Sequence, residues 1–432
     1  MLDIKYIREN PEKVKAGIAN KNENGNVDEL LAFDEERRNI IVQVEELKAT
    51  RNKVSSQIPK MKKAGEDTTE LLAEMKQVSD KITEMDSKLK NIDEKLNNLL
   101  MFIPNLPHES VPVGKTENDN KIMREWLPEG FSFESEKKFL DHVELGKKFN
   151  ILDFERGAKV SGSGFPVYIG KGATLERALL NFMLDFHLQN HNYTEVLPPF
   201  LVNKASMEGT GQLPKMEDDM YCIEKDGLYP IPTSEVPITN LHRNEILTDA
   251  ELPKNYVGYS ACFRREAGSY GKEAKGFLRV HQFNKVEMVK IVKPESSYEE
   301  LEIIVKDAED ILKALKIPYR INLLCTGDLS FSAAKCYDIE TWSPAENKWL
   351  EASSCSNYED FQARRAKIRF KREGDPANAG ASKKPEFVHT LNGSGLATSR
   401  LMVSLLENYQ TDNGTIEVPE VLKKYTGFEL IN

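Results

Sequence analysis

The stretch FRREAGSYGKEAKGFLRVHQFNKVEM, residues 263–288, joins two strand-like segments through a basic connection that contains glycine. The surrounding residues, 256–292, show the pattern that predicts two strands of a hairpin. In the second strand Phe283 and Glu287 share one face, whereas Val286 points to the other. The stretch therefore predicts a hairpin with one buried apolar face and one face that carries charged groups.

The charged face of this hairpin suits an anionic ligand. Alternation along the first strand places Arg264 and Glu266 on one face. A guanidinium bonds two oxygens of a phosphate or carboxylate at once, and Phe283 offers a ring for a purine. The connection is basic, which suits an RNA end or a triphosphate. Its glycines and basic residues are Gly268, Gly271, Gly276, Lys272, Lys275 and Arg279. The pattern also fits a hairpin whose polar face is merely solvated.

The segment PTSEVP, residues 232–237, offers a site for an ammonium group. Thr233 and Glu235 lie two positions apart, so they face the same way on an extended chain. Together they present a hydroxyl acceptor and a carboxylate. The alternative is an ordinary edge strand bounded by proline.

The segment NGSGLATSR, residues 392–400, precedes a predicted helix. Gly393 and Gly395 let a ligand approach the backbone closely. Arg400 is expected early in the helix, near its positive end, where an arginine needs an anionic partner. A glycine-containing turn with a surface arginine is the alternative.

The segment WLEASSCSN, residues 349–357, combines a carboxylate with hydroxyl groups. Such oxygen ligands suit Mg²⁺ held against phosphates. Strand alternation pairs Glu351 with Ser353, and the use of Ser354 instead requires a bulge or a bend. A polar edge strand without a ligand fits the same pattern.

Residues from about 28 to 100 carry an apolar repeat with steps of three and four, which predicts two coiled-coil helices of about four heptads each. The first series is Phe33, Ile40, Val44, Leu47, Val54, Ile58 and Met61, with Arg37 and Arg51 in two further positions. The second series is Leu71, Met75, Val78, Ile82, Met85, Leu89, Ile92, Leu96 and Leu99. The short connector, residues 64–67, makes the two helices antiparallel.

The ends of this helical pair are marked in the sequence. Asn26 with Glu29 predicts a start cap, and Pro104 and Pro107 end the second helix. Helices of about 35 residues give an arm roughly 50 Å long. Because a two-helix hairpin has no large core, we expect the arm to project from a body and to touch another molecule.

Residues from about 111 onward mix helices and strands without regular alternation. A helix is expected at about 297–315, and strands at RINLLC and KCYDIETW, residues 320–325 and 335–342. This order favours an α+β fold with an antiparallel sheet flanked by helices over a doubly wound parallel sheet. The sequence contains no GxxxxGK[ST] loop and no GxGxxG after a strand. We expect two domains, residues 1–110 and 111–432.

Composition argues against several classes of protein. The net charge of −10 argues weakly against a nucleic-acid-binding protein, although such a protein can still bind nucleic acid through a local basic surface. No apolar run approaches the roughly 20 residues of a membrane span, and MLDIKYIREN lacks the apolar core of a signal peptide. The five cysteines form no CxxC pair and the histidines show no zinc spacing. We therefore expect a cytoplasmic protein without zinc and without membrane association.

Taken together, these segments resemble bacterial-type seryl-tRNA synthetases, which are class II aminoacyl-tRNA synthetases. GATLERALLNFMLDFH through LPPF resembles motif 1, with Pro199 at the motif proline. The 263–288 stretch resembles motif 2, LNGSGLATSR resembles motif 3, and Thr233, Ser234 and Glu235 resemble the serine-binding TSE signature. The resemblance covers nearly the whole chain, including the arm.

The resemblance implies a role for each matching residue. The serine-binding residues are Thr233, Ser234, Glu235, Arg264, Glu287 and Ser394. The ATP-binding residues are Arg264, Arg265, Glu266, Val280, Phe283, Glu351, Ala352, Ser353, Ser354 and Arg400. Glu351 and Ser354 hold Mg²⁺ when ATP is bound, and Arg264 and Arg400 are the catalytic residues. The resemblance also implies a tRNA-binding domain at 1–110, a catalytic domain at 111–432, a homodimer, and tRNA(Ser) held by the arm and the motif 2 loop. Charging of tRNA(Sec) is a further expectation.

Two features depart from the family pattern. Many relatives have glycine before the motif 3 arginine, where this chain has Ser399, and residues 371–386 look like a flexible insert. Three rival interpretations are another class II ligase, for threonine, proline or a carrier protein; a non-catalytic relative that binds RNA; and a coiled-coil scaffold. The arm counts against a carrier-protein ligase, and retention of Arg264, Glu266 and Arg400 counts against a non-catalytic relative.

Overall fold

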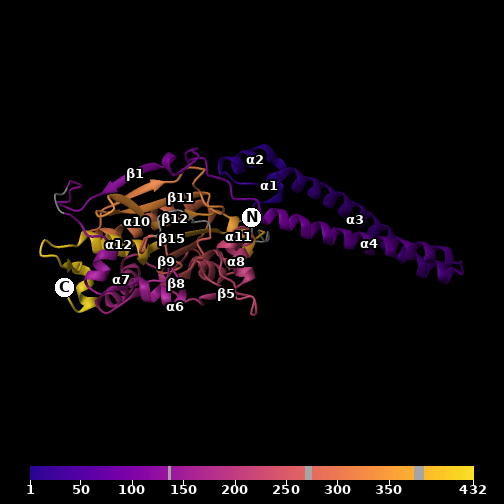
Figure 1. Cartoon of the computed structure of the whole chain (residues 1–432). Coiled ribbons are helices and arrows are strands. Elements are labelled where there is room, and N and C mark those ends of the chain that lie inside the picture. Colours follow the sequence, from indigo (N-terminus) through magenta and orange to yellow (C-terminus); the bar gives the residue numbers. More distant parts are fainter. Residues whose placement is uncertain (135–137, 268–274, 374–383) are drawn as a thin grey trace. The chain divides into compact units, whose positions relative to one another are not determined.

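A computed structural model describes residues 1–134, 138–267, 275–373 and 384–432 (Figure 1). The chain divides into two compact units. One contains Leu2–Ala19 and Glu23–Pro104, and the other contains Met1, Asn20–Asn22 and Asn105–Asn432. Gly268, Gly271 and Lys272 of the basic connection, and most of the 371–386 segment, lie outside the described residues.

The first unit contains two long antiparallel helices, α3 (Val27–Ala64) and α4 (Thr69–Met101), after the short α1 (Ile4–Glu9) and α2 (Pro11–Asn20). Its seam is apolar, as the heptad pattern predicts, and Ile40, Val44, Met85 and Ile92 form its buried cluster. Arg37 occupies a seam position and forms an ion pair with Asp93 of α4 at 2.5 Å.

Local signals end these helices where the sequence indicates. Asn26 caps α3, because its Oδ1 accepts the backbone N–H of Glu29 at 3.1 Å. Gly65 ends the helix with a φ of 78°, a left-handed conformation that glycine adopts without strain. The predicted coiled-coil arm is therefore confirmed.

The second unit is built on an eight-stranded sheet, which confirms the predicted α+β fold. Its strand order is β1-β10-β11-β12-β15-β9-β8-β4, and all neighbours are antiparallel except β4 and β8. The strands are β1 (Lys121–Trp126), β10 (Tyr319–Leu323), β11 (Lys335–Ser343), β12 (Lys348–Asn357), β15 (His389–Ala397), β9 (Gln282–Val292), β8 (Lys254–Phe263) and β4 (Thr194–Glu195).

Helices α7 (Lys171–Asn190), α10 (Ser297–Ala314) and α12 (Thr398–Asn408) pack on one face of this sheet. Val286 and Met288 of β9 point into the same core as Leu179 of α7 and Ile304 of α10. Strand alternation then directs Phe283 and Lys285 to the opposite face. That face is left open for the cavity described below.

Smaller elements complete this unit. The shorter helices are α5 (His142–Lys148), α6 (Phe154–Ser161), α8 (Lys204–Thr210), α9 (Glu235–Asn240), α11 (Phe361–Ala366) and α13 (Glu420–Thr426). The shorter strands are β2 (Leu152–Asp153), β3 (Val167–Tyr168), β5 (Leu201–Asn203), β6 (Leu228–Pro230), β7 (Ile246–Thr248), β13 (Arg369–Lys371), β14 (Glu386–Phe387), β16 (Ile416–Glu417) and β17 (Leu430–Ile431).

Two local predictions were wrong. PTSEVP is not extended: Ser234 has helical dihedral angles and α9 begins at Glu235, with Pro237 in the first turn, where its missing N–H is tolerated. The first hairpin strand ends at Phe263, and Glu266 has a φ of 53°, so simple alternation does not extend to Arg264 and Glu266. Both errors arise because period-2 reasoning assumes that a strand continues to the end of its motif.

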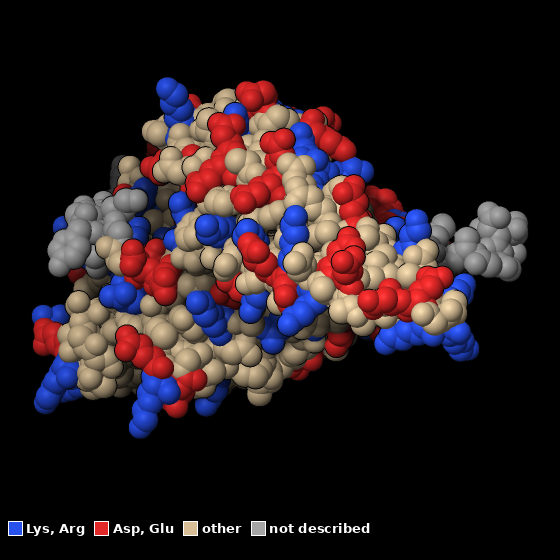
Figure 2. All heavy atoms as spheres, turned by 90° about the vertical axis from the view of Figure 1, so that its right-hand side faces the viewer, with Lys and Arg blue, Asp and Glu red and all other residues tan. Residues whose placement is uncertain are grey.

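Figure 2 shows one face of the molecule, on which acidic and basic side chains are interspersed. The net charge of −10 is therefore not gathered into a single acidic surface on that face. Within the described ranges, no helix combines the length and the apolar character needed to cross a membrane.

Candidate active site

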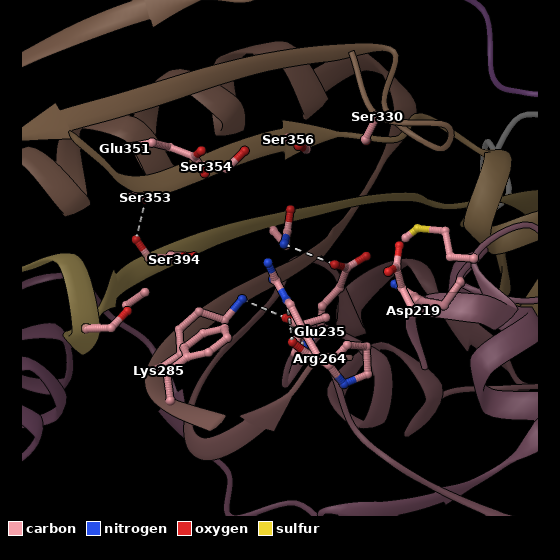
Figure 3. A pocket seen from close by; sticks show the side chains of 18 of the residues that line it. Asp219, Glu235, Arg264, Lys285, Ser330, Glu351, Ser353, Ser354, Ser356 and Ser394 are labelled. Carbon is pink, nitrogen blue, oxygen red and sulfur yellow. Dashed lines mark hydrogen bonds between the residues drawn. The ribbon is translucent and has the colours of Figure 1, made fainter. Parts of the chain in front are cut away.

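A cavity of about 600 Å³ opens on the uncovered face of the sheet (Figure 3). Its walls include residues of β9, β12, β15 and the first turn of α12. The predicted site residues that line it are Thr233, Glu235, Arg264, Glu266, Val280, Phe283, Glu351, Ala352, Ser353, Ser354, Ser394 and Arg400. Segments separated by as many as 167 positions thus meet in one place, as expected for a single site.

Three predicted residues lie outside this lining, as far as the described residues define it. Ser234 is fully buried and its hydroxyl donates to Ser260 at 2.5 Å. Arg265 donates to the backbone oxygen of Asp218 at 3.1 Å. Glu287 is fully buried directly behind the lining residues Thr233 and Lys285, which it contacts.

The acidic end of the cavity holds a hydrogen-bond network around Glu287. Its carboxylate accepts from the Thr233 hydroxyl at 3.0 Å and from Asn392 at 2.8 Å, and it forms an ion pair with Lys285. Lys285 also donates to Thr233 at 2.7 Å. Because a buried carboxylate is stable only when paired, this network holds Thr233 and Lys285 in fixed positions.

Glu235 is the second carboxylate of this end. Its two oxygens accept from Gln362 of α11 at 2.5 Å and from Asn392 of β15 at 3.2 Å. Burial, followed by the negative charge of Glu287, raises the pKa of Glu235 to about 7. When it is ionised, Glu235 offers its carboxylate to a cationic ligand, such as an ammonium group.

The basic end of the cavity carries two guanidinium groups. The Arg264 guanidinium lies 5.1 Å from the centre of the Phe283 ring. Arg400, in the first turn of α12, donates to the backbone oxygen of Glu351 at 2.8 Å and pairs with its carboxylate at 3.1 Å. Glu266, also in the lining, pairs with Arg279 at 2.8 Å. This end therefore suits an anionic group beside an aromatic ring.

A β-bulge decides which residues of β12 lie side by side. Glu351 pairs with Glu340 of β11 and Ser353 pairs with Ile339, so Ala352 is the extra residue. Beyond the bulge, Ser354 faces Asp338, on the same side of the sheet as Glu351. Ser353 instead donates to the carbonyl oxygen of Ser394 at 2.7 Å (Figure 3). Of the two arrangements that the sequence allowed, the structure has the bulged one.

Some residues at or next to the cavity were not assigned a role from the sequence. Lys285 and Asn392 stand inside the motifs, but Lys285 donates to Thr233, which precedes α9, and Asn392 donates to Glu235 of α9 and to Glu287 of β9. Gln362 lies in α11, which carries none of the motifs, and reaches Glu235 across the fold. The only local signal for Gln362 is a polar residue in an otherwise apolar helix face.

Comparisons with known proteins agree with this geometry. The family described as "tRNA synthetase class II core domain (G, H, P, S and T)" matches residues 218–409, and "Seryl-tRNA synthetase N-terminal domain" matches residues 1–107. A "Serine--tRNA ligase" of Chlorobium phaeobacteroides (strain BS1) is 60% identical over 437 residues and covers 100% of both chains. That of Chloroherpeton thalassium is 59% identical with the same coverage.

Solved structures give the same result. A seryl-tRNA synthetase from Pyrococcus horikoshii, complexed with ATP, is 42% identical with a TM-score of 0.91, covering 100% of this chain and 99% of its own. A cytoplasmic serine-tRNA ligase from Naegleria fowleri, in complex with AMP, is 31% identical with a TM-score of 0.86 and the same coverage. The chain therefore belongs to the seryl-tRNA synthetase family, a family of class II ligases.

Proposed function

We propose that this chain activates L-serine with ATP to form seryl-adenylate, and then transfers serine to tRNA(Ser). The observation that carries the proposal is one cavity lined by the acidic Glu235 and by the basic Arg264 and Arg400. A zwitterionic amino acid fits such a lining, because its ammonium and carboxylate groups have opposite charges. The complexes of the relatives with ATP and with AMP support a nucleotide in the same cavity.

At the acidic end, Thr233 and Glu235 bind the serine ammonium group, and Arg264 binds its carboxylate. Glu287 and Ser394 bind the serine hydroxyl. Because Glu287 lies behind Thr233 and Lys285, the serine hydroxyl joins an existing network and does not build a new one. Alanine has no hydroxyl group, so the network lacks the hydrogen bond that serine makes. The enzyme therefore discriminates strongly against alanine as a substrate. Threonine is rejected because its extra methyl group lacks room.

At the basic end, Phe283 stacks on the adenine and Glu266 helps to seat the adenosine. Arg264 contacts the α-phosphate, and Arg400 contacts the nucleotide from the opposite wall. The guanidinium of Arg264 already lies over the Phe283 ring, so both groups are positioned before ATP binds. The lining residues Val280, Ala352 and Ser353 complete the nucleotide site.

Glu351 and Ser354 fit the Mg²⁺ that accompanies ATP in this family. The bulge at Ala352 places a carboxylate and a hydroxyl, both hard oxygen donors, on one face of β12 and in the cavity lining. Bound there, Mg²⁺ supplies positive charge to the triphosphate oxygens. Arg400, which is paired with Glu351, keeps that carboxylate turned toward the cavity.

Catalysis is then mainly positioning and charge neutralisation. A serine carboxylate oxygen attacks the α-phosphorus, the bond to the β-phosphate bridging oxygen breaks, and pyrophosphate leaves. Arg264 and Arg400 stabilise the charge that builds on the phosphoryl oxygens. In the second step the terminal hydroxyl of tRNA attacks the adenylate carbonyl, and AMP leaves. The proposal assigns no side chain as a general base.

The coiled-coil arm binds the long variable arm of tRNA(Ser), and tRNA(Sec) is charged by the same route. The match to the N-terminal domain of the family at residues 1–107 supports this division of labour. In the proposed arrangement, residues 1–110 bind tRNA, residues 111–432 carry out catalysis, and the protein acts in the cytoplasm. Two chains form a homodimer, and tRNA bridges them.

The test is amino-acid-dependent ATP–pyrophosphate exchange with serine, threonine, proline and alanine in parallel. We expect exchange with serine to exceed that with the other three by several orders of magnitude. Exchange with threonine or proline at the serine level contradicts the assigned substrate. Absence of exchange with all four, in protein that still binds tRNA, indicates a non-catalytic relative.

A further inference from the structure

A second cavity, of about 540 Å³, lies beside the candidate active site and shares Glu351, Ser354 and Ser330 with it. Its remaining wall comes from β10, β11 and the segments around residues 117–120 and 328. None of the roles proposed above for serine, ATP or tRNA involves these additional residues. The lining is strongly polar, because it includes the side chains of Asn322, Asp328, Asp338, Glu340 and Arg320.

Three residues of this cavity form a row across three strands. Asn322 of β10 pairs directly with Asp338 of β11, and Asp338 pairs directly with Ser354 of β12. Directly opposed side chains on one face lie about 5 Å apart at their Cβ atoms. The row therefore brings an amide, a carboxylate and a hydroxyl together.

Asn322 carries an unsatisfied acceptor in this row. Its side chain is only 6% exposed, and its Oδ1 has no hydrogen-bond partner in the structure. The amide nitrogen donates to the Glu340 carboxylate at 2.7 Å, which fixes the orientation of the amide. The unpartnered atom is thus an oxygen. A buried acceptor without a partner is unfavourable by about 1–3 kcal/mol, so a ligand or a water molecule that pairs with it is favoured.

The charges of the cavity are only partly balanced. Glu340 pairs with Arg320, and Glu351 pairs with Arg400. Asp338 accepts hydrogen bonds from Cys336 at 3.6 Å and from Ser354, and Asp328 accepts from the neutral Asn120 at 2.7 Å. Within the described residues neither of these two aspartates forms an ion pair.

We propose that this second cavity binds a divalent cation through the Asn322 Oδ1, the Asp338 carboxylate and the Ser354 hydroxyl, with water completing its coordination. Amide, carboxylate and hydroxyl oxygens are the donors that hard divalent cations prefer. Among the described residues no three His, Cys, Asp or Glu are placed to hold a metal, so the proposed site depends on its amide and hydroxyl oxygens.

This ion is distinct from the Mg²⁺ proposed for the triphosphate. That ion requires Glu351 and arrives with ATP, whereas the new site requires Asn322 and Asp338 and is complete without nucleotide. The two positions have Ser354 in common, so the new ion also holds the Ser354 hydroxyl in place. Cation binding is measured without ATP or serine. The cation site can therefore be refuted while the proposed ligase reaction stands, and the ligase reaction can be refuted while the cation site stands.

The experiment measures Mn²⁺ alone, by the loss of its free electron paramagnetic resonance signal on titration with the whole nucleotide-free chain. We expect one bound Mn²⁺ per chain that Mg²⁺ displaces. Asn322→Leu, which keeps the side-chain volume, should weaken binding about tenfold or more, and Asp338→Asn should abolish it. Asn118→Leu is the matched control, because it makes the same substitution on the exposed rim of the cavity.

Two outcomes overturn the proposal. One is binding that survives Asn322→Leu and Asp338→Asn but is lost in Glu351→Gln, since the ion then belongs to the triphosphate position. The other is the absence of bound Mn²⁺ in the unaltered chain. If a variant fails to fold, anomalous diffraction from unaltered crystals soaked in MnCl₂ without nucleotide decides the matter. A peak next to Asn322 and Asp338 supports the proposal, and its absence refutes it.

Discussion

Arg400 and Glu351 join the first turn of α12 to the bulged strand β12. One Arg400 nitrogen lies 2.8 Å from the backbone oxygen of Glu351 and 3.1 Å from its carboxylate. The arginine therefore holds the cavity wall on which Glu351, the proposed Mg²⁺ ligand, stands. This contact connects α12 with the proposed triphosphate position.

Replacing Arg400 by lysine should lower kcat/KM for serine-dependent pyrophosphate exchange by about 10²–10³-fold. Lysine keeps the charge but loses the planar fork that can hold Glu351 and a phosphate together. Arg372→Lys is the control, since Arg372 pairs with Glu295 and Glu386 away from the cavity. A loss of similar size in both variants contradicts the role assigned to Arg400.

Glu287→Ala should abolish serine-dependent exchange and also destabilise the fold. Removal of the carboxylate leaves the buried Lys285 ammonium without its partner, which costs about 3–5 kcal/mol in the free energy of unfolding. The double variant Lys285→Met with Glu287→Leu removes both charges, so it should regain most of that stability without regaining exchange. Urea unfolding and exchange assays measure the two effects separately. Near-normal exchange in Glu287→Ala refutes the serine-binding role.

The carboxyl group of Glu235 should make stability and serine binding depend on pH in opposite directions. Its pKa is about 7 in the folded chain, against an ordinary value of 4.5, so the folded chain retains this proton over a wider range of pH. The resulting stability is fully present below pH 4.5 and is lost as pH rises through about 7, a total of about 3 kcal/mol.

Serine binding responds to the ionised carboxylate. We expect KM for serine to fall as pH rises through about 7, because the charged Glu235 attracts the ammonium group. Glu235→Gln should flatten the stability profile between pH 4.5 and 7 and remove this part of the KM profile. Identical stability profiles for the two proteins, measured by denaturant unfolding, would show that Glu235 titrates normally.

The two serines that follow the bulge should affect the Mg²⁺ dependence and the serine dependence of exchange differently. Ser354→Ala should raise the Mg²⁺ concentration for half-maximal exchange severalfold, because it removes a hydroxyl beside Glu351. Ser353→Ala breaks the hydrogen bond to the Ser394 carbonyl and should instead raise KM for serine. The measurement is exchange over a range of Mg²⁺ and serine concentrations. If Ser353→Ala changes the Mg²⁺ dependence and Ser354→Ala changes KM for serine, the assignment of Ser354 as an Mg²⁺ ligand is contradicted.

Two valines on the arm give a matched test of its role. Val44 is 4% exposed in the seam, whereas Val42 is 54% exposed. Val44→Ala should destabilise the α3–α4 hairpin by about 2 kcal/mol, measured by amide hydrogen exchange, and Val42→Ala should not. Aminoacylation of tRNA should weaken with Val44→Ala while serine-dependent pyrophosphate exchange stays unchanged. Equal loss of both reactions would place the arm in serine activation.

The sequence by itself determined the elements whose patterns are local. The seam of α3 and α4 follows from heptad spacing, because a helix repeats its buried face every 3.6 residues. The β8–β9 hairpin follows in the same way from alternation, and the placement of Arg400 early in α12 follows from a glycine-containing turn. The motifs also indicated which segments meet, since residues from all four of them line one cavity.

Only the tertiary structure decided the relationships that depend on pairing between distant segments. The bulge at Ala352 exists because β12 pairs with β11 in a particular register, and it selects Ser354 rather than Ser353 as the neighbour of Glu351. The approach of Gln362 to Glu235 depends on how α11 packs. Register and packing arise from contacts summed over the whole fold, so no stretch of sequence contains enough information to specify them alone.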